Sequence, residues 1–502
     1  MVKVRLHWRK AASTAACLAM AFLFLGCGKD SDPVDPPDPD PDPVVEPPAG
    51  NGNVGPRANT YDDPVNGIYV SPAGNDATAT GTKDKPYKSI NTALAAAPSG
   101  STIILRSGTY REGRDVRVRK SNITIKSAKG EWAVIDLTNP NPGNEEHSGV
   151  EFYAEDDETG GIVKDCKLQS VEVTGGFYTV CLETKWEWGQ ADRSGASNIV
   201  IEDCILHDST DDAVKVKPGC KNITIRYNEI YNSGRAYVAH PDFQSGERNS
   251  EGIDIVNGNK ITVHNNYIHD ICSNGLYAKG GSIDAIIENN IVERAYGAGI
   301  QLGFDTSPQY FDIGVNPNYY ENIGGIVRNN LIIDVGWEGI GLYASKDVQV
   351  YNNTVVNAVT YGNGNYHSPV YFGIATQDWD NPAGCPPNVN PNIHHNIVCQ
   401  PAAYNNRIID IRYANDVYAH GLSGLDGKPT MNNNCYYVAG KSATFTDNRP
   451  GSILTNAGFA AWKIHIDGES GSIEVDPALD ADYLPTNTQC AGMGITVALK
   501  HE

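Results

Sequence analysis

The amino-acid sequence predicts an all-β fold, a right-handed parallel β-helix (a solenoid) with a short N-terminal cap helix. Two observations predict it. One short unit recurs along the chain at a nearly regular spacing, and the segments between turns are short β-branched runs with almost no helix-length periodicity. A repeat of this kind is typical of solenoids, and short β-branched runs bounded by Gly and Asn are typical of strands.

The recurring unit ends in a column of asparagines. Successive intervals from Cys166 are 38, 24, 38, 24, 40, 23 and 43 residues, which indicates one coil of about two dozen residues that an insertion lengthens on alternate turns. Stacked Asn side chains can hydrogen-bond from one coil to the next, so we interpret the column as structural. Its members are Cys166, Cys204, Asn228, Asn266, Asn290, Asn330, Asn353 and Asn396.

A second column of short strands follows each Asn by about ten residues, and its side chains alternate between inward and outward positions. The inward pairs are Val214/Val216, Ile253/Ile255, Leu276/Ala278, Ile300/Leu302 and Ile340/Leu342. The outward rows are Lys215, Asp254, Tyr277, Gln301 and Gly341 and, two residues on, Lys217, Val256, Lys279, Gly303 and Tyr343. We expect these rows to form an exposed sheet face that carries the chemistry.

Both ends of the predicted coil have closing segments. Lys88 to Ala97 is predicted to be a short amphipathic helix that Pro98 stops, and Asp476 to Tyr483 is expected to close the other end. The opening stretch Ile68–Asp76 resembles the N-terminal cap of many secreted β-helix carbohydrate-active enzymes. Lyases, hydrolases and epimerases share that cap, so the resemblance implies a fold and leaves the reaction open.

The N-terminus predicts export. Residues 1–26 carry four cations followed by an apolar run, which is typical of a signal peptide. Phe24-Leu25-Gly26-Cys27 resembles the lipobox of bacterial lipoproteins, with Phe24 where an aliphatic residue is usual, which implies a lipid anchor on Cys27. Residues 27–59, rich in Pro and Asp, are expected to be a hydrated tether, and residues 60–502 the β-helix domain.

Charge and targeting together restrict the partners. The formal net charge of −21 becomes −25 once the four signal-peptide cations are removed, which argues against nucleic acid as a partner. We expect an outer-membrane lipoprotein exposed at the cell surface, a monomer, whose partner is an extracellular polysaccharide. An acidic protein can bind an acidic polymer when a divalent cation lies between them.

Two segments resemble the pectate lyases of polysaccharide lyase family 9. Ser250-Glu-Gly-Ile-Asp254 is similar to that family's Asp-Asp-Gly-Trp-Asp calcium loop, and Asn274-Gly-Leu-Tyr-Ala-Lys-Gly-Gly281 is similar to its Asn-Gly-Phe-Lys-Leu-Gly-Gly. The resemblance implies that Glu251 and Asp254 bind Ca²⁺ and that Lys279 is the catalytic base. Ser250 replaces a carboxylate, and Lys279 lies two residues later than the family pattern, on the same face but about 6 to 7 Å further along the strand.

The residues alone also favour a cation site. Ca²⁺ binds several carboxylate or carbonyl oxygens, and Asp212 and Glu251 occupy the same column on adjacent coils, with Asp211 and Asp254 on the same edge. A plainer interpretation stays open. Acidic residues at solenoid turns are common turn chemistry, and Lys215 opposite Asp254 could form an ordinary ion pair between coils.

Six further residues are expected to contact the substrate. Tyr277, Lys217 and Gln301 lie on the predicted outward rows, and the others fall in long insertions that would rise beside the sheet, where aromatic rings can stack on sugars. These others are Arg248, Trp186 and Trp188.

Three functions remain open from the sequence. The first is a calcium-dependent lyase that cleaves an acidic, pectin-like polysaccharide by β-elimination. The second is a glycoside hydrolase, for which Asp211, Asp212, Glu251, Asp254 and Glu338 offer carboxylate pairs. The third is a surface glycan-binding or adhesive protein without catalysis, in which the aromatic residues matter and Lys279 does not.

Overall fold

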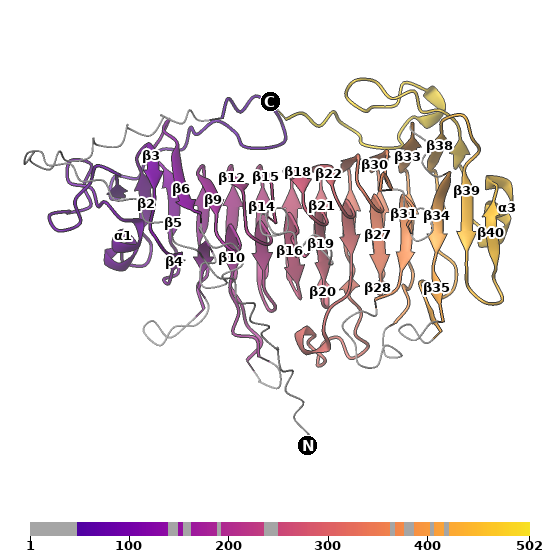
Figure 1. Ribbon diagram of the computed structural model, residues 1–502, viewed down its shortest axis with the longest axis horizontal. Coiled ribbons are helices and arrows are strands. Elements are labelled where there is room, and N and C mark those ends of the chain that lie inside the picture. Colours follow the sequence, from indigo (N-terminus) through magenta and orange to yellow (C-terminus); the bar gives the residue numbers. More distant parts are fainter. Residues whose placement is uncertain are drawn as a thin grey trace, which may run out of the picture. The chain divides into compact units, whose positions relative to one another are not determined.

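The chain winds into stacked coils, and each regular coil adds one strand to each of three sheets (Figure 1). The structure is a computed structural model that describes residues 48–138, 149–153, 162–187, 192–234, 249–361, 367–375, 386–401, 406–415 and 421–501. The expected signal peptide, the lipid-anchored Cys27 and most of the expected tether lie outside these residues.

Sheet 1 carries the strand that opens each coil. Among the described residues its strands, in spatial order, are β1 (Ile68–Val70), β2 (Thr102–Leu105), β5 (Thr124–Ser127), β8 (Lys167–Gln169), β11 (Val200–Glu202), β14 (Lys221–Arg226), β17 (Asn259–His264), β21 (Ile286–Glu288), β25 (Ile326–Arg328), β29 (Gln349–Tyr351), β32 (Asn392–His394) and β37 (Thr430–Asn432). Three short strands lie beside this order of strands and pair with one another, starting from β17: β20 (Ser282–Ile283), β24 (Asn322–Ile323) and β28 (Ser345–Lys346).

Sheet 2 follows sheet 1 along the chain in each coil. Its described strands are β3 (Gly108–Tyr110), β6 (Ala133–Leu137), β9 (Glu172–Gly175), β12 (Ile205–His207), β15 (Glu229–Tyr231), β18 (Tyr267–Ile271), β22 (Ile291–Ala295), β26 (Leu331–Ile333), β30 (Thr354–Val356), β33 (Ile397–Gln400), β38 (Cys435–Val438) and β41 (Ile473–Glu474).

Sheet 3 closes each coil and carries the candidate site. Its described strands are β4 (Val116–Val118), β7 (Val150–Phe152), β10 (Val180–Leu182), β13 (Val214–Val216), β16 (Ile253–Val256), β19 (Leu276–Lys279), β23 (Ile300–Leu302), β27 (Ile340–Tyr343), β31 (Val370–Gly373), β34 (Arg407–Ile411), β39 (Thr444–Asp447) and β40 (Leu454–Ala457). The pairing of β40 with β39 is antiparallel, as is that of the separate hairpin β35 (Tyr413–Ala414) with β36 (Leu422–Ser423). The predicted parallel β-helix is therefore confirmed.

The asparagine column is a continuous hydrogen-bonded ladder at the turn between sheets 1 and 2, as predicted. Asn290 Nδ2 donates to Asn330 Oδ1 at 3.0 Å, and Asn266 Nδ2 donates to Asn290 Oδ1 at 2.9 Å. The ladder extends one coil beyond the predicted members, because Asn396 Nδ2 donates to Asn434 Oδ1. These amides satisfy backbone groups that each buried bend would otherwise leave without a partner.

The core fills the inside of the coils. The predicted inward pairs of the second column are 0 to 1% exposed, and they belong to one continuous apolar cluster that runs the length of the helix. Side chains of consecutive coils lie above one another at the spacing of parallel strands, about 4.8 Å. Burial of this repeated Val, Ile and Leu stripe, added coil by coil, is what stabilises the fold.

Helices cover both ends of the coil (Figure 1). At the N-terminal end α1 (Ile90–Ala96) begins after Ser89, whose side chain accepts a hydrogen bond from Thr92 N, and it buries Ile90, Ala93 and Leu94, which confirms the predicted cap helix. At the other end α3 (Phe459–Ile466) buries Trp462 and Ile466. The short 3₁₀ helices are η2 (Pro308–Tyr310) and η4 (Thr488–Cys490).

The two terminal segments meet on the outside of the coil, a feature that the sequence did not predict. After β41 the chain runs back along sheet 2, where Ile495 and Leu499 pack with Leu331 and Ile333, so the segment expected to close the C-terminal end begins this return tail instead. Lys500 O then accepts hydrogen bonds from the backbone N–H groups of residues 53 and 54 at 2.9 and 3.0 Å (Figure 1).

The N-terminal partner of the tail belongs to the expected tether. Val54 is 2% exposed and Asn59 5% exposed, and Arg57 forms an ion pair of 2.8 Å with Asp203. Asn59 Nδ2 donates to the carbonyl oxygens of Ala128 and Glu131. Residues 53–59 are therefore packed on the β-helix, and the expected end of the tether at residue 59 was wrong because apolar and paired side chains there find partners on the coil. Among the described residues, no helix is both long and apolar enough to span a bilayer.

Candidate functional site

The candidate site lies on the outer side of sheet 3. Strand register places Lys215 beside Asp254, Asp254 beside Tyr277, Tyr277 beside Gln301 and Gln301 beside Gly341. The predicted outward row is therefore confirmed. Neighbouring members of the row are in contact across the parallel strands, at the short inter-strand spacing of a sheet.

The row is not exposed, and here the expectation was wrong. Asp254 and Tyr277 are 1% exposed and Gln301 is 0% exposed. Residues of different coils pack against each other, and the ring of Phe304, from the insertion after β23, stacks on Tyr277 with centroids 5.9 Å apart. Alternation along a strand gives the direction of a side chain, but the insertions decide what covers it.

Three carboxylates from two adjacent coils converge at one end of this row. The ligand atoms of Asp212, Glu251 and Asp254 all lie within 4.8 Å of one another, and all three residues are buried. Asp212 precedes β13 and Glu251 precedes β16, so the register of these strands stacks the two turns. Asp212 Oδ1 accepts a hydrogen bond from Glu251 N at 2.8 Å, which fixes that stacking.

The next coil supports the same cluster. Ser273 Oγ and Asn274 Nδ2 donate to Glu251 Oε1 at 2.9 and 3.0 Å, and Asn274 Oδ1 accepts from Ala298 N at 2.8 Å. This polar chain holds Glu251 by one oxygen only. The geometry of the carboxylate is thus set by neighbouring turns and does not depend on a flexible loop.

Several oxygens of the cluster have no hydrogen-bond partner among the described residues. They are one carboxylate oxygen each of Asp211, Glu251 and Asp254, together with the hydroxyl of Tyr277. A buried polar atom without a partner costs about 1 to 3 kcal/mol, and more when it is charged. A set of unpartnered carboxylate oxygens is the donor set that Ca²⁺ prefers, so the residues present fit a divalent cation.

Lys215 supplies the cation that the cluster already contains. Its Nζ donates to Asp212 Oδ2 at 3.0 Å and to Asp254 Oδ2, which confirms the ion pair between coils that the plainer interpretation foresaw. The three carboxylates of the cluster exceed this single ammonium by two charges. A divalent cation would neutralise that excess.

Burial and repulsion by neighbouring carboxylates raise the pKa values of Asp211, Asp212 and Glu251. Burial and the neighbouring Asp212 raise the pKa of Asp211 to about 9, and burial together with Asp212 and Asp254 raises the pKa of Glu251 well above its usual range. Without a metal, Asp211 therefore holds a proton at neutral pH. A cation that binds to this carboxylate has to displace that proton.

Lys279 lies on the same face, one coil after the acidic cluster. Strand register places it beside Val256. Its charge also reaches the acidic cluster: burial is the main cause that raises the pKa of Glu251, and the charge of Lys279 lowers it. The small or apolar neighbours on the adjacent coils, Val256 and Gly303, predict an unpaired Lys279, and this was wrong. Its Nζ donates to Asp305 O at 3.1 Å and lies 4.3 Å from the ring centroid of Tyr277, because the insertion after β23 folds over the strand end.

The turn after Lys279 depends on two glycines. Gly280 and Gly281 have φ angles of 66° and 90°, which residues with a Cβ rarely adopt. Gly280 N donates to Glu321 Oε2 at 2.6 Å. This turn ends β19 directly at Lys279 and so fixes where its side chain leaves the sheet.

Glu321 is a buried acid that the sequence pattern did not reveal. It lies in the insertion before β24, and burial raises its pKa to about 8, although hydrogen bonds from Gly280 N and Thr306 Oγ1 lower it. Insertions carry no repeat, so no periodicity singles this residue out. It supports the loop that holds Lys279.

The expected substrate contacts have mixed outcomes. Burial, Asp254 and Glu251 raise the pKa of Tyr277 well above its usual range, so its hydroxyl stays protonated. Lys217 Nζ is paired with Glu183 Oε1 at 2.6 Å, and Gln301 Nε2 donates to Glu338 Oε1 at 2.8 Å. All three residues are already engaged in contacts within the protein.

Trp186 was expected to be an exposed wall residue, and the structure contradicts this. Its side chain is packed, because Nε1 donates to Gln309 O at 2.9 Å, the Arg193 guanidinium lies 4.3 Å from the ring, and the residue is 8% exposed. The insertion that carries it therefore folds back on the protein. Trp188 and Arg248 lie outside the described residues.

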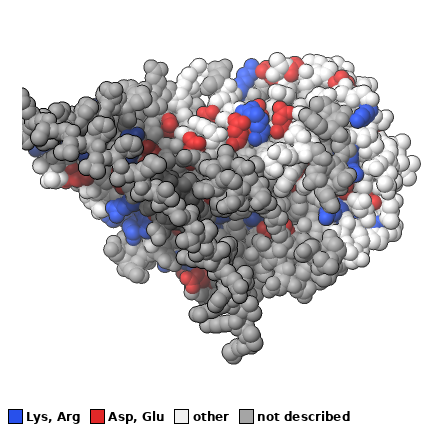
Figure 2. Space-filling model, viewed as in Figure 1, with Lys and Arg blue, Asp and Glu red and all other residues white. Residues whose placement is uncertain are grey.

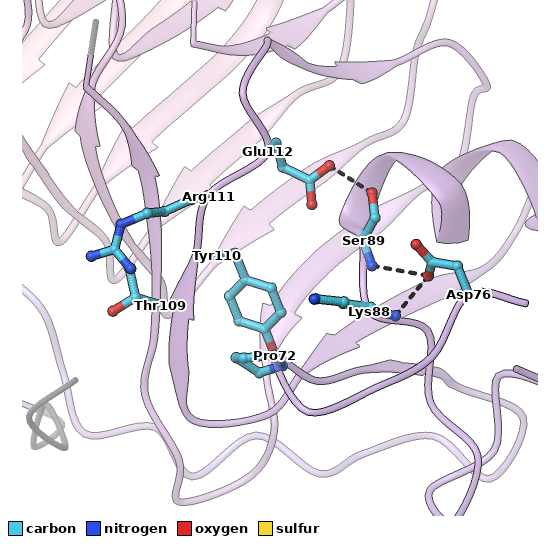
Figure 3. Close-up of a pocket in the computed structure, with 8 residues that line it drawn as sticks. All are labelled: Pro72, Asp76, Lys88, Ser89, Thr109, Tyr110, Arg111 and Glu112. Atoms are coloured by element: carbon cyan, nitrogen blue, oxygen red, sulfur yellow. Dashed lines mark hydrogen bonds between the residues drawn. The ribbon is translucent and has the colours of Figure 1, made fainter. Parts of the chain in front are cut away.

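A separate pocket of about 390 Å³ lies at the N-terminal cap (Figure 3). Its two acids are not available as a catalytic pair. Asp76 accepts hydrogen bonds from Lys88 N and Ser89 N, and Glu112 accepts them from Ser89 Oγ and Ile90 N. Figure 3 shows both carboxylates directed at the start of α1, so they act as helix caps.

The charges on the visible surface are mixed. Figure 2 shows acidic and basic side chains close together on the face in view, with no large area of one sign among its coloured atoms. Asp212, Glu251 and Asp254 are the one group of three or more potential metal ligands found among the described residues.

Comparison with known families gives one match that covers most of the chain. The family described as "Right handed beta helix region" matches residues 66–309 and 194–372.

Two curated proteins are similar over shorter segments. The chain is 42% identical to Pectate lyase PEL9 of Emericella nidulans over 74 residues, which are 14% of this chain and 18% of that protein. It is 31% identical to the uncharacterized protein YwoF of Bacillus subtilis over 117 residues, 22% of this chain and 25% of that protein. The chain thus spans a quarter or less of the length of these relatives.

Solved structures with similar backbones come from proteins of several kinds. Pectate lyase Pel9A has a TM-score of 0.45 at 15% identity and covers 88% of this chain and 90% of its own. The Dettilon tailspike protein has a TM-score of 0.45 at 16% identity, over 83% of this chain and 70% of its own. The A-module of the Azotobacter vinelandii mannuronan C-5 epimerase AlgE4 has a TM-score of 0.46 at 14% identity, over 74% and 94%.

Proposed function

Because the chain belongs to the right-handed β-helix family, we propose that it is a polysaccharide lyase that cleaves an acidic, uronate-containing polymer by β-elimination with Ca²⁺ as cofactor. One observation carries the proposal. Three buried carboxylates lie on the same face as Lys279, one coil away, and two of them, Glu251 and Asp254, each have an oxygen with no hydrogen-bond partner among the described residues. β-Elimination next to a carboxylate needs a base and a group that neutralises the carboxylate, and an amine beside a metal site supplies both.

Lys279 is the proposed base. In its neutral form the amine takes the proton on the carbon next to the uronate carboxylate, the electron pair forms a carbon–carbon double bond, and the glycosidic oxygen leaves with its bonding electrons and is protonated from solvent. Tyr277 cannot replace it, because burial, Asp254 and Glu251 raise the pKa of its hydroxyl well above its usual range. The hydrogen bond of Lys279 to Asp305 O orients the amine at the strand end.

Asp212, Glu251 and Asp254 are the proposed cation ligands, with Asp211 at their edge. When bound, Ca²⁺ would neutralise the uronate carboxylate and so make the adjacent proton more acidic. The residues themselves contribute preorganisation. Ser273, Asn274 and the backbone of Glu251 hold two of the carboxylates before any ion arrives.

The substrate class follows from the matched relative. Pectate lyase PEL9 acts on pectate by its name, and we extend a pectin-like substrate to this chain. We further propose that a lipid on Cys27 anchors a monomeric protein to the outer membrane, with the β-helix at the cell surface. This location would bring the site to an extracellular polysaccharide too large to enter the cell.

The test is an absorbance assay on the purified protein. It is incubated with a panel of uronate polymers, and the ultraviolet absorbance of unsaturated ends is followed with Ca²⁺ and with a chelator. We expect absorbance that the chelator abolishes and that Lys279→Ala lowers by at least about 10³-fold, since the base takes part directly in the chemical step. Lys260→Ala, an exposed lysine on sheet 1, is the matched control and should keep full activity.

Other results would favour the other functions. Reducing ends without absorbance would indicate a glycoside hydrolase that uses the acidic cluster. Retention on a polysaccharide gel with neither signal would indicate a glycan-binding protein without catalysis. Undiminished absorbance in Lys279→Ala would refute the proposed base.

A further inference from the structure

A second polar group lies on the same edge of the coil as the acidic cluster, further towards the C-terminal end. Strand register aligns the residues that follow Glu251 with those that follow Glu338, three coil steps later. The separation is about 14 Å at the strand spacing of a parallel sheet. A polymer that lies along this edge would reach both places with sugar units a few positions apart.

We propose that His367, Trp337 and Tyr361 form a second sugar-binding subsite, which holds a pyranose ring of the polysaccharide at this distance from the acidic cluster. Glu338 is its positioning residue. The inference rests on the proposed function for its substrate class. It assigns to these residues the binding of the chain and not the cleavage of its bonds.

Glu338 is a buried carboxylate with a full set of donors. Gln301 Nε2 and Tyr343 Oη donate to its Oε1 at 2.8 and 2.7 Å, and His367 Nδ1 lies 2.6 Å from its Oε2. Burial raises the pKa of Glu338, but His367 and these hydrogen bonds lower it by more, so the net direction is down. Gly341 makes room for the group, because a Cβ there would lie 2.8 Å from Glu338 Oε1.

The carboxylate decides which nitrogen of His367 can accept a hydrogen bond. Because Glu338 accepts at Nδ1, the neutral ring carries its hydrogen there, and Nε2 becomes a hydrogen-bond acceptor. The His367 side chain is 15% exposed, and among the described residues Nε2 has no hydrogen-bond partner. An oriented acceptor in a partly exposed ring suits a sugar hydroxyl, which donates.

Trp337 stacks on the His367 ring, and Tyr361 lies on the neighbouring coil. Trp337 is half-buried and stacks on His367 with centroids 5.0 Å apart and an interplanar angle of 8°. Tyr361, from the next coil, is 55% exposed, and its ring packs edge-on against Tyr296 at 4.1 Å. An exposed ring and an oriented polar atom on the same edge of the coil match a pyranose, which has an apolar C–H face and hydroxyls at its rim.

The backbone fixes Tyr361 at this place. Its N–H donates to Gly336 O at 3.1 Å, and a Cβ on Gly336 would approach the Tyr361 ring to 3.1 Å. The ring is therefore seated on the preceding coil by its own backbone. The ring is thus held in place at the surface, where the apolar face of a sugar ring can stack on it.

The experiment measures binding without cleavage. Calorimetry in the Lys279→Ala background gives the Kd for long uronate oligosaccharides, compared with Tyr361→Ala, with His367→Ala and with the control Ile464→Ala, an 82% exposed side chain at the far cap. We expect each subsite variant to bind about tenfold more weakly and the control to bind unchanged. Tyr361 is exposed, so its replacement leaves the core intact.

A spectroscopic readout tests Glu338 as a positioning residue. The ¹⁵N shifts of the His367 ring should report hydrogen on Nδ1 in the wild-type protein and a mixture of tautomers in Glu338→Gln. A merely structural role of Glu338 would leave the tautomer unchanged, which would overturn the assignment.

The outcomes separate the two proposals. Unchanged Kd in both subsite variants, or no binding of any uronate oligosaccharide, overturns the subsite. Unsaturated products from a protein whose variants bind normally would leave the lyase proposal standing and remove the subsite. Weaker binding by the subsite variants of a protein that makes no unsaturated product would support the subsite and refute the lyase proposal.

Discussion

His207 provides a prediction of how the stability of the fold depends on pH. Its ring lies between two carboxylates, with Nδ1 2.8 Å from Asp208 Oδ2 and Nε2 3.2 Å from Glu172 Oε1, and its side chain is 11% exposed. Burial alone would lower the pKa of His207, but Asp208 and Glu172 raise it from 6.5 to about 9. The charged ring is thus favoured in the folded protein.

The sign of the effect follows from this direction. A pKa that is higher in the folded than in the unfolded state contributes stability that is fully present below pH 6.5 and is lost as the pH rises through 9. A shift of one pKa unit corresponds to about 1.4 kcal/mol, so the shift of His207 amounts to about 3 kcal/mol. His207→Gln keeps a polar side chain and removes the titration.

The assay is urea unfolding at pH 6 and at pH 9.5, followed by tryptophan fluorescence. Between these two values the wild-type protein should lose about 3 kcal/mol more free energy of unfolding than His207→Gln does. Glu172→Gln, which removes one of the raising carboxylates, should lose an intermediate amount. A difference between wild type and His207→Gln that is the same at both pH values would refute the reasoning.

Three further predictions test the ladder, the metal site and the loop at Lys279. Asn290→Ala should lower the free energy of unfolding by about 4 kcal/mol in urea, since it leaves several buried partners in two neighbouring coils without the hydrogen bonds of this side chain; a loss below about 1 kcal/mol would contradict this. Glu251→Gln should abolish the rise in Tm on adding Ca²⁺, because it removes one of the three converging carboxylates; an equal Tm rise in variant and wild type would exclude Glu251 as a ligand. Because burial raises the pKa of Glu321 to about 8, the wild type should lose up to about 1.4 kcal/mol per pH unit relative to Glu321→Gln between pH 4.5 and 8, and parallel stability curves would show that this acid stays ionised.

The repeat carried most of the fold prediction. Asn290 and Asn330 stand at equivalent places in successive coils, and a side chain that must satisfy the same buried bend in every coil leaves a periodic signal in the sequence. The inward residues follow from the two-residue period of strands. Register in a parallel coil then places Asp212, Glu251 and Asp254 together, which is why the repeat alone was enough to group three acids that are dispersed along the chain.

The insertions limited the prediction of the site. Phe304, Asp305 and Glu321 cover or hold the row of sheet 3, yet they lie in segments with no counterpart in other coils. Nothing in a repeat indicates where such a segment folds. The expected exposure of the row and of Trp186, and the expected freedom of Lys279, failed for this one reason.

The return tail changes how the coil should unfold. A bare solenoid is held by contacts between neighbouring turns, so it can fray from either end one repeat at a time. Here Gly494 of the tail accepts a hydrogen bond from Asn352. Lys500 of the tail donates to Asn53, which in turn accepts a hydrogen bond from Asn265, several coils away from Asn352. Coils that are not neighbours are thereby connected, and we expect the domain to unfold as one cooperative unit rather than one repeat at a time from its ends.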